Sequence, residues 1–177
     1  FKKDDQIFLA KQVEVELQEK EATQKHTYTK KSNEESLKRL AERLHATEIL
    51  EKITNIIRKE MGSAYEWPGK TGRSFAFVEK TDEGRPTYRV YLSIYLSENR
   101  PNSVQLYFQP RAIDVAKEAF DKLKKNYKEL TLDPRYDSLH IWLKKGEQLE
   151  RFCEDLKELV KEIETGWKNK QMQSEAD

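Results

Sequence analysis

The chain has 177 residues, of which 36% are hydrophobic and 37% charged, so it can bury one core but not two. Lys and Arg number 33 and Asp and Glu 32, which excludes a net positive charge strong enough to attract nucleic acid or an acidic membrane. An anionic partner would have to be bound by a local basic patch. Cys153 is the single cysteine, which excludes an intramolecular disulfide and a cysteine-rich metal site and is typical of a reducing compartment.

The apolar runs are short and the N-terminus lacks a targeting pattern. No run approaches the roughly 20 apolar residues that a membrane span needs, so we expect a cytoplasmic protein that does not contact a membrane. The chain opens with Phe1, Lys2 and Lys3 instead of a signal peptide or an initiator Met, which predicts a piece of a longer protein or a processed chain.

The first 31 residues fit two structures. Val13 to Leu17 alternates like a strand, whereas Leu9, Val13 and Leu17 are four apart, as on one helix face. The surrounding Lys, Glu and Gln favour a helix. We therefore expect residues 1–31 to be an extension or linker, partly helical, before a single domain over residues 32–169.

A long helix is predicted over residues 33–61. Ser32 and Glu35 have the spacing of a capping box, and Gly62 is a natural stop. A bend is expected near Ala46 and Thr47. The helix carries one apolar stripe, composed of Leu37, Leu40, Leu44, Ile53, Ile56 and Ile57.

Three strands follow a predicted loop over residues 63–73. Short turns separate strands over residues 74–80, 87–97 and 103–109, which favours an antiparallel meander. In the central strand the even positions are apolar, a strict period of two.

The C-terminal part predicts a helix over 112–128, a strand over 138–143, a helix over 147–167 and a disordered tail over 170–177. The fold class is thus α+β: a mainly antiparallel sheet of about four strands, with helices packed on one face, in the order α(α)-βββ-α-β-α.

If the even side of strand 87–97 faces the helices, the other sheet face is polar and aromatic at once. The long N-terminal helix could cover this face, or it could stay in contact with water. It could also be a recognition surface for nucleic acid or for a protein. The side chains that would carry binding are Arg89, Tyr91, Tyr95, Tyr107, His140 and Trp142.

Gly69, Lys70 and Thr71 resemble part of a phosphate-binding loop, but Ala64 stands where that motif needs glycine. A solvated turn is the simpler interpretation. Lys70 and Arg73 are nevertheless candidates for contacts with a phosphate backbone.

Local patterns for catalysis and metal binding are weak. The acidic pair Glu14 and Glu16 lacks the lysine of a nuclease motif, the three histidines lie far apart, and Cys153 fits a core position. We therefore expect no catalytic residue, metal or cofactor. A site assembled only in three dimensions leaves no local pattern, so an enzyme stays an open alternative.

The order of elements from Trp67 to Trp167 is similar to a family of uncharacterised α+β domains. The likeness lies in the aromatic strands Tyr88–Leu92 and Val104–Phe108, the helix with Phe120–Leu123, and the strand Ser138–Trp142. These domains occur C-terminal to restriction-endonuclease-like nuclease domains in bacterial and archaeal proteins. The resemblance implies an accessory module in DNA metabolism or genome defence, without catalytic residues of its own.

The leading hypothesis is therefore a non-catalytic binding module of a larger intracellular protein, which engages nucleic acid or a protein through the second sheet face. Two alternatives are a structural or oligomerisation domain that uses its long helices and an enzyme with a spatially assembled site.

Overall fold

The computed structural model describes residues 30–81 and 84–176, with side chains up to residue 173, and the predictions for residues 1–29 lie outside this part. Its centre is a six-stranded sheet in the order β1-β2-β3-β4-β6-β5, in which every neighbouring pair is antiparallel. The strands are β1 (Tyr65–Pro68), β2 (Gly72–Lys80), β3 (Pro86–Tyr95), β4 (Ser103–Phe108), β5 (Thr131–Asp133) and β6 (Ser138–Lys144).

The α+β class and the antiparallel sheet are confirmed, but the expected number of strands is wrong. The four predicted strands are β2, β3, β4 and β6. β1 lies in the predicted loop over 63–73, and β5 ends at the turn over residues 134–137. Both are too short to show a period of two, so only their pairing with β2 and β6 identifies them.

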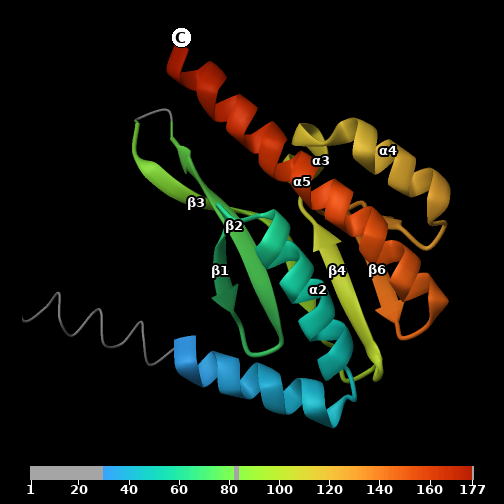
Figure 1. Ribbon diagram of the computed structural model, residues 1–177. Coiled ribbons are helices and arrows are strands. Elements are labelled where there is room, and N and C mark those ends of the chain that lie inside the picture. Colours follow the sequence, from blue (N-terminus) through green and yellow to red (C-terminus); the bar gives the residue numbers. More distant parts are fainter. Residues whose placement is uncertain (1–29, 82–83, 177) are drawn as a thin grey trace, which may run out of the picture.

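The predicted helix over 33–61 is two helices that meet at a sharp corner (Figure 1). The first spans residues 30–43 and already includes Ser32, so the capping box predicted there is wrong. The second is α2 (Thr47–Glu60). Between them His45 has a φ of 54°, a left-handed conformation that ends the first helix. The turn before β4 fixes the corner, because the amide of Asn102 donates to the carbonyl of Leu44 at 2.7 Å.

The later helices also differ from their predicted bounds. The region 112–128 forms α3 (Pro110–Val115) and α4 (Lys117–Asn126), which meet at Ala116. The last helix, α5 (Glu147–Ala176), continues through the segment predicted as a disordered tail. Within the described residues, none of the helices is long and apolar enough to cross a membrane.

The core lies between one sheet face and the helices, with α5 in contact with α2, α3 and α4 (Figure 1). Phe108 of β4 meets Phe120 of α4 edge-to-face at 5.0 Å, and Phe77 of β2 stacks on Trp167 of α5 at 4.3 Å. The apolar stripe of the two N-terminal helices is buried in the same core, apart from the partly buried Ile56.

Candidate functional site: the open face of the sheet

A β-bulge in β3 decides which side chains reach the second sheet face. Phe75 pairs with Leu92 whereas Ala76 pairs with Val90, so Tyr91 is an extra residue in β3. The extra residue reverses the alternation. Ser93 and Tyr95, after the bulge, lie on the face away from the helices, which we call the open face. Before the bulge, it is the even-numbered residues of β3 that lie on the open face.

Two predicted binding residues are therefore misplaced. Tyr91 is fully buried on the helix face, edge-to-face with Phe77 at 5.0 Å, and its hydroxyl donates to Glu79 at 2.6 Å. Burial and the nearby Glu79 carboxylate hold the pKa of Tyr91 well above its ordinary value. Arg89 pairs with Phe77 and also lies on the helix face. The prediction for both failed because it assumed a regular strand.

The other four predicted side chains do come together on the open face, and we call them the four-ring cluster. Tyr95 and Tyr107 have ring centroids 6.3 Å apart, and Tyr107 lies parallel to His140 at 5.9 Å. Gln105 of β4 pairs with Tyr95 of β3 on one side and with Trp142 of β6 on the other, so the three residues form one row across the sheet. These rings come from β3, β4 and β6, three adjacent strands of the sheet.

Two further contacts fix the cluster at its edges. The guanidinium of Arg100 lies 4.7 Å from the ring centroid of Trp142, a cation–π distance. Gly72 lies beside Tyr95 in the register, and a Cβ there would lie 2.1 Å from the backbone oxygen of Ile94 and 2.9 Å from the Tyr95 ring, so glycine is needed where the two strands pair.

The Tyr107 hydroxyl is held in place by hydrogen bonds. It accepts from Ser138 Oγ at 3.0 Å and donates to Asp133 Oδ2 at 3.3 Å. Hydrogen bonds from Arg135 lower the pKa of Asp133, so this carboxylate is ionised and its charge is neutralised by the arginine. These two hydrogen bonds hold the tyrosine ring in one orientation. His140 Nδ1 is buried beside it and has no hydrogen-bond partner among the residues described.

A second aromatic group lies on the same face and was not predicted. Tyr65 and Trp67 of β1 and Tyr88 of β3 form a three-ring cluster, with Tyr88 edge-to-face to both others at 4.9 and 4.8 Å. The three side chains are 50%, 42% and 51% exposed. They were missed because β1 was assigned to a loop and Tyr88 to the core face. Tyr65 and Trp67 are two residues apart, as on one face of a strand, but two positions are too few to predict a strand.

Small side chains separate the two clusters. Trp67, Ser74, Ser93 and Tyr107 form one row of paired positions across β1 to β4. Ser74 and Ser93 have their hydroxyl oxygens 3.0 Å apart in the middle of the row. Three strand spacings place Trp67 roughly 14 Å from Tyr107.

The two sheet faces carry different charges. Along the six strands as described, Asp133 is the one carboxylate on the open face, whereas Glu66 and Glu79 lie on the helix face, where each pairs with arginine. Alternation puts Lys144 on the open face beside Trp142, and Lys80 lies there at the end of β2.

The two predicted phosphate contacts have different positions. Lys70 is exposed in the turn between β1 and β2. Arg73 instead lies on the helix face and is ion-paired with Glu34 and Glu66, so it is not part of the open face.

The comparisons with known proteins add no relative: no protein-family model, curated protein or solved structure matches this chain. Among the described residues no group of three or more His, Cys, Asp or Glu side chains could hold a metal ion.

Proposed function

We propose that this domain binds single-stranded nucleic acid through the open face of its sheet. The observation that carries the proposal is the presence of two aromatic clusters on one sheet face, while the described helices pack against the other. A flat sheet face with aromatic rings offers stacking positions to unpaired bases.

Stacking accounts for most of the expected affinity. A base on an aromatic side chain contributes about 1–3 kcal/mol and tolerates any base, because every base has a π-face. The exposed rings of Trp67 and Tyr95 are available from solvent without any movement of the backbone. The oriented pair Tyr107 and His140 adds a platform at the neighbouring position.

The charge of the face favours an anionic ligand. Arg100 lies over the Trp142 ring, Lys144 follows Trp142 on the same face, and Lys70 is exposed in the turn between β1 and β2. The Asp133 carboxylate is neutralised by Arg135. Three phosphate contacts give a slope of log affinity against log salt of about −2 for a single strand. The chain's net charge of +1 supports no strong attraction to duplex DNA, so we expect duplexes to bind more weakly.

The alternative of an oligomerisation domain that uses its long helices is less well supported. The apolar stripe that would pair with another chain is occupied in this chain's own core. An accessory role beside a nuclease domain, which the likeness over Trp67–Trp167 implies, is compatible with single-strand binding and is part of the proposal.

The test is a titration of fluorescein-labelled ten-nucleotide DNA and RNA strands, followed by anisotropy at about physiological salt. We expect the Tyr95→Ala/Trp142→Ala double variant to bind far more weakly than the unmodified protein. Tyr136→Ala is the matched control, because Tyr136 is a 61% exposed tyrosine outside both clusters. Equal affinity of the double variant and the control would refute the proposal, as would an absence of binding up to tens of micromolar protein.

A further inference from the structure

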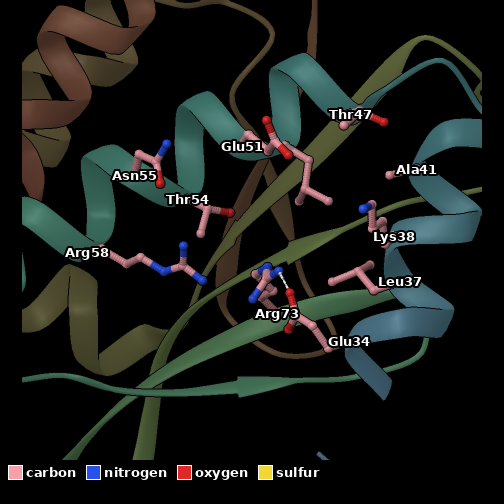
Figure 2. Close-up of a pocket in the computed structure, with 11 residues that line it drawn as sticks. Glu34, Leu37, Lys38, Ala41, Thr47, Glu51, Thr54, Asn55, Arg58 and Arg73 are labelled. Atoms are coloured by element: carbon pink, nitrogen blue, oxygen red, sulfur yellow. Dashed lines mark hydrogen bonds and ion pairs between the residues drawn. The ribbon is translucent and has the colours of Figure 1, made fainter. Parts of the chain in front are cut away.

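A pocket of about 330 Å³ lies between the helix of residues 30–43 and α2, on the helix face and away from the aromatic clusters (Figure 2). Leu37 and Thr54 line its inner wall, and the guanidinium of Arg73 rises into it from β2. Arg58 points toward the same centre from α2. The volume is at the lower end of the range for small-molecule sites.

The inner wall holds polar atoms without partners. Thr54 is 2% exposed, yet its Oγ1 makes no hydrogen bond within the described part of the chain. A helical threonine commonly bonds the carbonyl four residues earlier, and Thr54 does not. Arg73 Nε is likewise buried and without a partner. Buried polar groups are nearly always satisfied, so two unpartnered polar atoms beside one pocket offer hydrogen bonds to a ligand that enters it.

Arg73 shows what kind of ligand fits. Its Nη1 pairs with Glu66 and its Nη2 with Glu34, so the Nε that flanks Nη2 is left unused. A guanidinium presents Nε–H and Nη2–H side by side, a fork that matches the two oxygens of one carboxylate. Arg58 uses this fork fully, because its Nε and Nη2 both bond Glu66, at 2.7 and 2.9 Å.

Glu34 and Glu66 hold Arg73 with different firmness. The side chain of Glu66 is 20% exposed and is shared by both arginines, whereas that of Glu34 is 46% exposed and bonds only one donor. Because Glu34 is the more exposed of the two partners, an incoming carboxylate can take its place and keep the mostly buried charge of Arg73 paired. Without Glu34, the lining carries Lys38, Arg58 and Arg73 against the carboxylate of Glu51. Glu66, which pairs with both arginines, adds one more negative charge, so an excess of positive charge is left at the pocket.

We propose that this pocket binds a small organic carboxylate, which displaces Glu34 and takes both Nε and Nη2 of Arg73. Thr54 donates its hydroxyl to the same carboxylate, and the apolar wall formed by Leu37 and Leu50 contacts the ligand's carbon skeleton. The Glu34 carboxylate occupies half of the ligand's position in the free protein. This site is separate from the proposed nucleic-acid surface and does not depend on it.

The test follows the Arg73 Nε–H and Thr54 amide signals by NMR as sodium propionate is added, with sodium chloride at equal ionic strength as the blank. We expect saturable shifts at both signals with propionate. Glu34→Gln removes the competing charge and should tighten binding severalfold, a gain that unfolding cannot imitate. Glu35→Gln is the matched control, since Glu35 is an exposed neighbour that does not line the pocket.

Arg73→Lys keeps the charge and removes the fork, so it should abolish the saturable shift at Thr54. Inorganic phosphate is the second probe, and equal or tighter binding of phosphate would overturn the assignment to a carboxylate. Shifts no larger than those from chloride would overturn the site itself and assign the unpartnered atoms to water. Equal propionate affinity in Glu34→Gln and Glu35→Gln would overturn the displacement of Glu34.

Discussion

Tyr107 and His140 face each other across β4 and β6 with rings 5.9 Å apart and only 6° from parallel. Because the Tyr107 hydroxyl is fixed by Ser138 and Asp133, the two rings form a prearranged platform. We predict that His140→Ala lowers the affinity for a single-stranded ten-mer roughly 5- to 150-fold, the loss of one stacked base. Anisotropy titration measures this, and circular dichroism checks that the fold is retained.

The three-ring cluster should contribute only to longer ligands. Trp67 lies roughly 14 Å from Tyr107, about four stacked nucleotide steps of 3.4 Å. Trp67→Ala is therefore expected to weaken binding of a ten-nucleotide strand strongly and binding of a three-nucleotide strand little. The same loss for both lengths would show that the two clusters do not act on one strand.

Tyr91 should matter for stability and not for binding. Tyr91→Phe removes the hydrogen bond to the Glu79 carboxylate, which would destabilise the fold by about 1.5–3 kcal/mol. Urea unfolding measures the change, and nucleic-acid affinity should stay the same once the variant is folded. A loss of affinity without a loss of stability would place Tyr91 on the binding surface and would contradict its position on the helix face.

Gly166 of α5 lies close against the backbone of Val115 in α3. An added Cβ would lie 2.2 Å from the backbone oxygen of Val115, so Gly166→Ala should cost about 1–3 kcal/mol. This exceeds the gain of 0.5–1 kcal/mol that alanine brings to a helix interior. Gly62→Ala is the control, because nothing lies within 4 Å of its added Cβ. Equal stability of the two variants in urea would contradict the close packing.

Glu66 predicts a dependence of stability on pH. Burial by itself would raise its pKa, but the hydrogen bonds from Arg58 and the charge of Arg73 outweigh burial and lower it. A carboxyl group whose pKa is lower in the folded protein stabilises the fold at pH values above its unfolded pKa of about 4.3. This contribution is lost as the pH falls through the folded pKa. Glu66→Gln should therefore be less stable than the unmodified protein at pH 7, with the difference shrinking below about pH 4. If the difference in stability between the two proteins instead grows as the pH falls, the pKa of Glu66 is not lowered by folding.

The sequence predicted the sheet well where the strands are long and less well elsewhere. The alternation in β4 and β6 placed Tyr107, His140 and Trp142 on one face, because nothing interrupts the register there. In β3 the bulge at Tyr91 was invisible, since tyrosine suits either face and no Gly or Pro marks the irregularity. The break at His45 was missed for a similar reason: its cause is the contact of Leu44 with Asn102, 58 positions along the chain, and not a local signal.

The pocket beside Arg73 could not be predicted at all. It depends on the corner between two helices that the sequence joined into one, and on the position of Arg73 on the helix face. Neither follows from local patterns, because the corner is fixed by tertiary contacts.

The three tryptophans give the most direct test of single-strand binding through the open face. Trp67 and Trp142 lie on the open face, whereas Trp167 stacks on Phe77 on the helix face. Each has one indole N–H signal in a ¹H–¹⁵N NMR spectrum, which can be followed as a ten-nucleotide strand is added. We predict that the Trp67 and Trp142 signals shift and saturate together while the Trp167 signal stays in place. A shift of Trp167 alone, or no shift of any indole signal, would contradict binding through the open face.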